Sequence, residues 1–306
     1  MNTKKPNFFI VGAPKCGTTA LNDYLKQHPN IFIPHKKELH YFGTDLDFKY
    51  KHFSRNRAQY LANFSLAKDE KMLGEASVWY LFSKLAAKEI KDFNPSSKII
   101  VMLRNPVDML YSQHSQFFFD GNEDIINFEE ALEAEEERKK GNKIPKTVGL
   151  IEGLFYRETI RYAEQVKRYF ELFGRENVHI IIFDDFRNDT AAVYKKTLDF
   201  LGVDNSFKAE LKVINKYKKI KDVGLHNTLL NLPTIPRKIA QAVIPSKIRR
   251  NWLNSVKENN TVYGKPDPMS PDLRKKLMHE FKEEVEKLSG ILDRDLSGWS
   301  DVKGKE

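Results

Sequence analysis

The segment FFIVGAPKCGTTALNDYL, residues 8–25, constrains the fold of this chain more than any other stretch. Four apolar residues lead into a turn with glycines at positions 12 and 17, and a helical pattern follows directly. In such a unit the glycines let backbone N–H groups converge, and the positive end of the helix points at the same place. The segment therefore predicts an anion-binding loop after a buried strand.

The loop departs from a nucleotide-binding P-loop in one respect. Its glycines keep the G-x-x-x-x-G spacing, but Thr18 and Thr19 stand where a Walker A sequence has lysine followed by serine or threonine. The only lysine of the loop, Lys15, lies inside it. Because the usual partners of a magnesium triphosphate are missing, we expect a smaller phosphate group that is bound without a metal.

Two further apolar runs, residues 98–103 and 178–183, resemble the first strand, and helical segments lie between the three. Parallel strands that are buried on both faces are apolar at nearly every position. Their alternation with helices predicts a sheet covered on both sides. We therefore predict an α/β, P-loop-type three-layer fold with a central parallel sheet flanked by helices, as a single domain over residues 1–306.

Three later segments predict helices. Residues 128–142 place acidic residues before basic ones, which favours a solvated surface helix ending near Gly141. The next helix is expected to pack on the sheet through an apolar stripe of Tyr162, Val166, Tyr169 and Phe173. Residues 227–254 combine prolines with an aliphatic and basic tract, which indicates helices packed on the main domain; a lid or a membrane-surface element is the alternative.

Charge and cysteine content narrow the function classes. The 306 residues include 51 basic and 42 acidic ones, a net charge of +9, which favours a phosphorylated, sulfated or nucleic-acid partner. No nucleic-acid module is recognisable, so no nucleic-acid partner is expected. The single cysteine favours a reducing compartment, and no apolar run approaches the length of a membrane span. We expect a cytoplasmic protein and leave peripheral membrane contact and oligomeric state open.

The loop sequence FFIVGAPKCGTTAL resembles the 5′-phosphosulfate-binding loop of sulfotransferases that use 3′-phosphoadenosine 5′-phosphosulfate (PAPS), above all the branch of bacterial and heparan sulfate N- and O-sulfotransferases. The string RNPVDMLYS, residues 104–112, resembles the family's 3′-phosphate motif, and a guanidinium suits that dianion. The resemblance implies that Arg104 and Ser112 bind the 3′-phosphate. It also implies that the 5′ end is bound by Lys15, Cys16, Gly17, Thr18 and Thr19.

The segment PHKKELHYFG, residues 34–43, resembles the family's K-E-P-H-F-F motif. The resemblance implies that Glu38 is the base that takes the proton of the acceptor, a role that suits a carboxylate within hydrogen-bond reach. His40 is the competing base. A surface ion pair of Glu38 with Lys36 or Lys37 is the plainer alternative.

Two weaker matches follow. GEASVWYL, residues 74–81, resembles an element beside the acceptor cleft; this implies substrate contacts for Ser77 and Tyr80 and an orienting role for Glu75 toward basic groups, with ordinary core as the alternative. Lys265 matches the last cofactor loop of the family, although the usual lysine-glycine-arginine triplet is absent. Gln116 stands where the N-sulfotransferases have a histidine, so acceptor details of that subgroup are not transferred.

Together these matches imply transfer of a sulfuryl group from PAPS to a hydroxyl or amine, with Lys15 stabilising the leaving group and no metal required. A carbohydrate or glycoconjugate is the first choice of acceptor, and a lipid-linked or small hydroxylated metabolite is the second. A P-loop kinase acting on a phosphorylated small molecule and a noncatalytic anion-binding protein are the alternatives. Cys16 is interpreted as a small filler of the loop, or else as a redox-sensitive thiol at a helix start.

Overall fold

The computed structural model describes residues 4–49, 54–212, 217–222, 224–225, 228, 255–256, 258–264 and 267–301. The strands are β1 (Phe8–Gly12), β2 (Ile31–Phe32), β3 (Met72–Ala76), β4 (Lys98–Leu103), β5 (Val178–Ile182), β6 (Tyr217–Ile220) and β7 (Thr261–Gly264). The helices are α1 (Thr18–Leu25), α2 (Arg57–Ala62), α3 (Ala86–Phe93), α4 (Pro106–Asp120), α5 (Phe128–Glu133), α6 (Glu135–Lys139), α7 (Tyr156–Thr159), α8 (Tyr162–Phe173), α9 (Phe183–Asn188), α10 (Thr190–Leu201), α14 (Pro271–Glu280) and α15 (Lys282–Leu292). Short 3-10 turns are η1 (Ile151–Leu154), η2 (Arg175–Asn177) and η3 (Ser297–Trp299). Lys265 and, apart from residue 228, the tract 227–254 lie outside the described residues. No described helix is long and apolar enough to cross a membrane.

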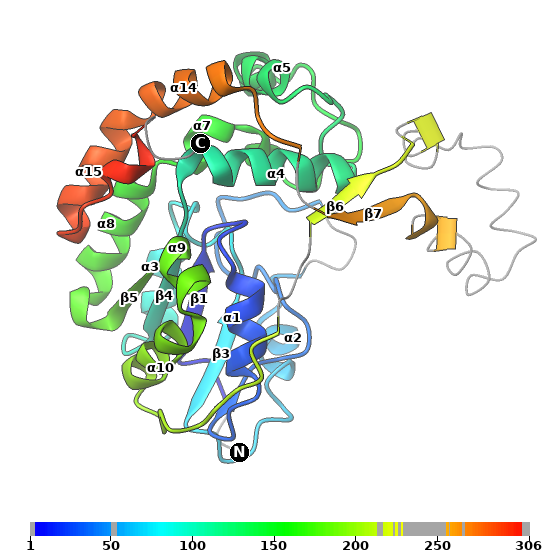
Figure 1. The fold of residues 1–306 in the computed structure, drawn as a ribbon. Helices are drawn as coiled ribbons and strands as arrows, with labels where there is room; N and C mark the ends of the chain where they lie inside the picture. Colours follow the sequence, from blue (N-terminus) through cyan, green and yellow to red (C-terminus); the bar gives the residue numbers. More distant parts are fainter. Residues whose placement is uncertain are drawn as a thin grey trace, which may run out of the picture.

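Five of the described strands form one parallel sheet in the order β2-β3-β1-β4-β5. β1 lies at its centre, so Phe8 is opposite Gly74 of β3 on one side and Lys98 of β4 on the other. Figure 1 shows α8 and α15 on one side of the sheet and α1 on the other. The predicted α/β fold, with a parallel sheet between helices, is confirmed. Because the strands run in one direction, the loops that follow them meet at one edge, where open α/β sheets bind ligands.

The core follows the apolar patterns of the sequence. The side chains of residues 8–11 in β1 and 99–103 in β4 are fully buried, as strands covered on both faces require. The stripe predicted for α8 is also buried: its four members are at most 4% exposed. The third predicted strand is one residue shorter than expected, because Phe183 opens α9 instead of ending β5.

The prediction of one solvated helix over residues 128–142 is wrong. Two short helices, α5 and α6, occupy this segment, and Arg138 of α6 is fully buried. Its guanidinium forms a two-pronged ion pair with Glu123, at 2.8 and 2.6 Å, and the Tyr156 hydroxyl donates to the same carboxylate at 2.8 Å. A buried pair of this kind is held by its fork geometry and extra hydrogen bonds. The charge pattern could not reveal it, because Glu123 lies outside the helical pattern.

A two-stranded antiparallel sheet that the sequence did not predict lies apart from the main sheet. Its strands β6 and β7 pair with Tyr217 opposite Gly264 and Ile220 opposite Thr261. Figure 1 shows the two-stranded sheet beside α4, extending away from the main sheet.

Candidate active site

The anion loop joins β1 to α1, and its two glycines are needed for different reasons. Gly17 has a φ of 90°, a conformation that side chains disfavour, and a Cβ there would lie 3.2 Å from the ring of Phe183. Gly12 has a φ of 150°, and a Cβ there would lie 2.6 Å from the carbonyl oxygen of Val78. The loop therefore packs directly against the segments that follow β3 and β5.

The loop leads directly into the start of α1. The N–H of Ala13 donates to the carbonyl of Met102 in β4 at 2.7 Å, which fixes the start of the loop. The N–H groups of residues 17–19 donate to no other described residue. They lie at the start of α1, where helical N–H groups lack partners and the dipole favours an anion. Such a helix start is suited to an anion.

Lys15 and Arg104 meet at this loop. The Lys15 ammonium lies 3.1 Å from the side-chain oxygen of Gln116 in α4. Burial lowers the pKa of Lys15; nearby Asp120 opposes this shift, whereas Arg104 adds to it. Arg104, directly after β4, donates to the carbonyl of Lys15 at 3.3 Å and stacks over Phe183, 4.8 Å from the ring centre. Two cations predicted from separate motifs thus lie at the same loop, close enough for Arg104 to affect the pKa of Lys15.

Ser112 lies on the same side of α4 as this cluster. It precedes Gln116 by four residues, and residues with that spacing share one face of a helix. Because Gln116 contacts Lys15, the half-buried Ser112 is directed toward the loop side of α4. The structure therefore brings the loop, Arg104 and Ser112 into one region of the sheet edge.

Glu38 is tied to the anion loop through Lys37. The Lys37 ammonium lies 2.5 Å from one carboxylate oxygen of Glu38 and 3.4 Å from the hydroxyl of Thr18. The other carboxylate oxygen accepts the N–H of Val78 at 3.0 Å. The plainer alternative, an ion pair of Glu38 with Lys37, is thus present. The side chain of Lys37 is only 18% exposed and that of Glu38 31%, and the pair lies beside the anion loop. The pair forms part of the same site.

His40, the competing base, is more enclosed than Glu38. Its ring is stacked on Phe48 at 4.1 Å, and its side chain is 7% exposed. Burial lowers the pKa of His40 to about 4, against the opposing effect of Glu38. Its Nε2 atom lies 3.5 Å from the Glu38 carboxylate. His40 is therefore a neutral, buried neighbour of Glu38 near neutral pH.

The predicted substrate contacts of Ser77 and Tyr80 are not what these side chains make. Both residues are at most 1% exposed, and their hydroxyls donate to the buried carboxylate of Glu75 at 2.7 Å each. Glu75 faces these hydroxyls and that of Tyr60, not the basic groups expected from the sequence. The physical reason is that Glu75 belongs to β3, an inner strand of the sheet that the sequence patterns did not reveal, and its side chain is buried in the core.

Cys16 fits its interpretation as a buried part of the loop. Its thiol is fully buried and donates to the carbonyl of Pro14 at 3.2 Å. Burial raises the pKa of Cys16 to about 12, although Arg104 opposes the shift. The reactive form of a cysteine is the thiolate, so this thiol is protected twice, by its enclosure and by its protonation.

We predict that Cys16 in the native protein does not react with iodoacetamide at pH 8, whereas the unfolded chain is alkylated. Intact-mass measurement with and without guanidinium chloride checks this. Rapid alkylation of the folded protein would instead support a redox-sensitive thiol.

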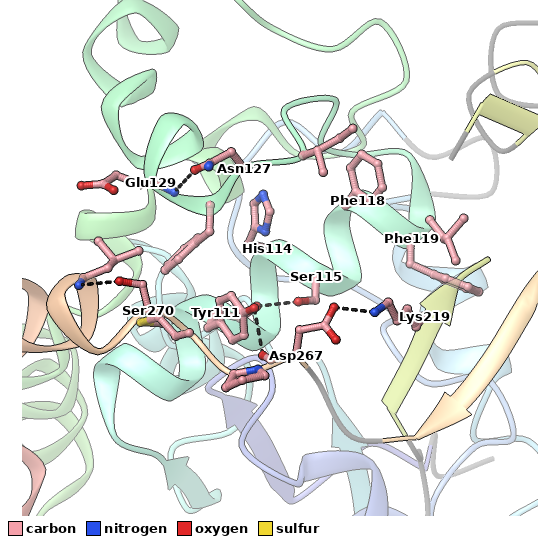
Figure 2. A pocket seen from close by; sticks show the side chains of 16 residues that line it. Tyr111, His114, Ser115, Phe118, Phe119, Asn127, Glu129, Lys219, Asp267 and Ser270 are labelled. Carbon is pink, nitrogen blue, oxygen red and sulfur yellow. Dashed lines mark hydrogen bonds and ion pairs between the residues drawn. The ribbon is translucent and has the colours of Figure 1, made fainter. Parts of the chain in front are cut away.

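A pocket of about 410 Å³ lies next to this region, beside α4 (Figure 2). The α4 side chains that line it are Tyr111, His114, Ser115, Phe118 and Phe119. Lys219 and Asp267, paired at 2.5 Å, also line it. None of the site residues predicted from the sequence is among the described residues that line this pocket. Since Ser112 is one position along from Tyr111, about 100° around the helix, the pocket and the anion site lie on neighbouring faces of α4.

Three residues of the site escaped the sequence analysis as functional groups: Lys37, Gln116 and Phe183. The lysine pair before Glu38 was a signal for Lys37, because a cation next to a base candidate affects its charge. Gln116 was noted only as a departure from a motif. Phe183 had no signal, since its contact with Arg104 depends on where β5 ends. Among the described residues, no group of three His, Cys, Asp or Glu side chains is arranged to hold a metal ion.

Comparison with known proteins identifies the family. The family model described as "Sulfotransferase domain" matches residues 5–259. The chain belongs to the sulfotransferase family. The crystal structure of a sulfotransferase from Alicyclobacillus acidocaldarius superimposes on this sulfotransferase with a TM-score of 0.73 and 33% identity, covering 97% of this chain and 100% of that one. The family predicted from the two anion motifs is confirmed.

Curated relatives are more distant. The membrane-associated sulfotransferase kil1 of Dictyostelium discoideum is 22% identical to this sulfotransferase over 95% of this chain and 66% of its own length. The bifunctional heparan sulfate N-deacetylase/N-sulfotransferase 4 of mouse is 29% identical over 65% of this chain and 22% of its own length. Mouse carbohydrate sulfotransferase 15 is 32% identical over 42% of this chain and 30% of its own length. The sulfotransferase chain therefore spans less than two thirds of each of these relatives.

Proposed function

We propose that the protein transfers a sulfuryl group from PAPS to a hydroxyl or amine of a carbohydrate or glycoconjugate. The observation that carries the proposal is the meeting of three separate motifs at one sheet edge: the anion loop, Arg104 after β4, and the Lys37–Glu38 pair. Each motif matches a part of the family's donor and base machinery.

The residues of the site fit PAPS. The N–H groups of residues 17–19 and the Thr18 hydroxyl would bind the 5′-phosphate, because they lie at a helix start and these N–H groups donate to no other described residue. Arg104 and Ser112 would bind the 3′-phosphate, with the guanidinium supplying paired donors. Lys265, which lies outside the described residues, is the weaker candidate for a further charge there.

In the mechanism, the hydroxyl oxygen or amine nitrogen of the acceptor substrate attacks the sulfur of PAPS, and Glu38 takes the proton that this atom loses. Glu38 is the better candidate because it is partly exposed, whereas His40 is stacked in the core. Lys15 stabilises the negative charge that grows on the departing phosphate oxygen, an interaction that is stronger in the transition state than before it. Lys37 contacts both the base and Thr18, so it positions the carboxylate relative to the donor.

The acceptor is proposed from the relatives that are named for heparan sulfate and carbohydrate sulfation. A lipid-linked or small hydroxylated acceptor is the second candidate. A cytoplasmic location stays a prediction based on cysteine content, and the Dictyostelium relative is named membrane-associated.

The deciding experiment incubates the protein with ³⁵S-labelled PAPS and a panel of saccharides, lipids and phenols. Transfer to a saccharide supports the proposal. A parallel calorimetric titration compares adenosine 3′,5′-bisphosphate with ATP and Mg²⁺. Tighter binding of ATP and Mg²⁺, without sulfate transfer, would favour the kinase alternative and reject the sulfotransferase activity.

A further inference from the structure

A buried carboxylate lies behind the candidate base. Glu75 is 2% exposed and is the last residue but one of β3, next to the active-site edge. Three hydroxyls donate to it: Tyr60 at 2.5 Å, Ser77 at 2.7 Å and Tyr80 at 2.7 Å. A carboxylate in a low-dielectric interior is costly unless such donors satisfy it. Glu75 plays no part in the proposed transfer, so its presence in the core needs another reason.

Two of the three hydroxyls also hold the loop that carries the base. The N–H of His40 donates to the Ser77 oxygen at 3.1 Å, and the N–H of Phe42 donates to the Tyr80 oxygen at 3.2 Å. A hydroxyl has one proton to donate. Because both hydroxyls donate that proton in a hydrogen bond to Glu75, each oxygen presents its lone pairs to the loop. Tyr60 differs, since its hydroxyl donates to Glu75 without contacting the loop.

The loop needs such support. Glu38 has a φ of 61° and His40 a φ of 50°, left-handed conformations that cost free energy in residues other than glycine. The backbone persists in these conformations only if surrounding contacts fix it. Besides the two hydroxyls, the bond from the Glu38 N–H to the Ala76 carbonyl, at 2.9 Å, ties the loop to the end of β3.

We propose that Glu75 is a positioning residue: by orienting the Ser77 and Tyr80 hydroxyls, it holds residues 38–42 in the strained conformation that aims the Glu38 carboxylate into the site. The effect of Glu75 on catalysis rests on the proposed function, whereas its effect on the conformation of residues 38–42 does not. Burial raises the pKa of Glu75 to about 7, so the experiments belong at pH 8, where the carboxylate form is present.

The test compares four variants that differ in their link to the loop. Glu75→Gln replaces the carboxylate that accepts the three hydrogen bonds. Ser77→Ala and Tyr80→Phe each remove one hydroxyl that contacts the loop. Tyr60→Phe is the matched control. Tyr60→Phe removes a hydroxyl from the same carboxylate but keeps the ring that stacks on Tyr41 at 4.1 Å. Hydrogen-deuterium exchange of residues 38–43, kcat, KM for the donor and Tm are measured for each.

We expect Glu75→Gln, Ser77→Ala and Tyr80→Phe to lower kcat about tenfold with KM for the donor unchanged, because misplacing a catalytic group by a fraction of an ångström has effects of this size. The same three variants should speed amide exchange in residues 38–43. Tyr60→Phe should leave both values within about twofold of wild type while lowering Tm as the others do, since it loses a buried hydrogen bond of similar worth.

Equal loss of kcat in Tyr60→Phe and Ser77→Ala, or unchanged exchange in Glu75→Gln, would overturn the role. If Glu75→Gln does not fold, Ser77→Ala and Tyr80→Phe against Tyr60→Phe still decide it. Exchange is measured without substrate, so it tests the positioning role even if the wild-type protein transfers no sulfate. Absence of sulfate transfer by the wild-type protein would reject the proposed function and leave the positioning role of Glu75 to be decided by the exchange data.

Discussion

Replacement of Glu38 by glutamine is expected to lower kcat for sulfate transfer by about 10²- to 10⁴-fold, the range usual for loss of a general base. Glutamine keeps the size of the side chain and an oxygen that can accept the Val78 N–H, so the loop should hold its shape. It cannot take the proton of the acceptor. Binding of adenosine 3′,5′-bisphosphate should stay within about threefold of wild type, because Glu38 is not among the residues proposed to bind this nucleotide.

The control is His40→Gln, assayed in parallel by transfer kinetics and by calorimetry with adenosine 3′,5′-bisphosphate. His40 is enclosed by Phe48, so its replacement should act mainly through local packing and retain part of the activity. Full activity in Glu38→Gln together with a complete loss in His40→Gln would assign the base to His40. Loss of nucleotide binding in Glu38→Gln would show that the carboxylate shapes the donor site.

Arg104→Ala is expected to weaken the binding of adenosine 3′,5′-bisphosphate about 100-fold, the effect of removing a charge-assisted, partly buried phosphate contact. AMP, which lacks the 3′-phosphate, should bind the variant nearly as well as wild type. The prediction is therefore a fall in the ratio of the two affinities, measured by calorimetry at fixed ionic strength.

Arg104→Lys serves as the matched control, because it keeps the charge and loses the fork. It should recover only part of the affinity for the bisphosphate. The structure also offers a contrary outcome: Arg104 contacts the Lys15 carbonyl and the ring of Phe183, so it could act by shaping the loop. Equal weakening of AMP and of the bisphosphate would assign it that structural role.

Much of the fold could be predicted from local patterns. The continuous apolar runs of β1, β4 and β5 specify strands buried on both faces, and the stripe of α8 specifies its packing. β2 and β3 escaped because β2 has only two residues and β3 includes Gly74 and a buried Glu75, which interrupt an apolar pattern. The two-stranded sheet of β6 and β7 was not predicted because these strands pair across a long separation in the sequence.

The site could be predicted where one short segment carries the chemistry. The anion loop and Arg104 follow strands directly, so their position at the sheet edge follows from the fold. The roles of Ser77 and Tyr80 could not be deduced, because strand register decides whether a hydroxyl faces a cleft or a buried carboxylate. Contacts such as that of Lys15 with Gln116 depend on how α4 lies across the edge.

The place of β1 at the centre of the sheet bears on how the chain is made. Its neighbours, β3 and β4, emerge from the ribosome only after residues 76 and 103 have been synthesised. Until then both edges of this apolar strand lack partners, a state that favours association with other chains. The donor nucleotide, whose two phosphates are proposed to bind after β1 and after β4, cannot assist during that interval. We therefore expect a chaperone that covers β1 to be most useful before β4, which carries Arg104 at its end, has been synthesised.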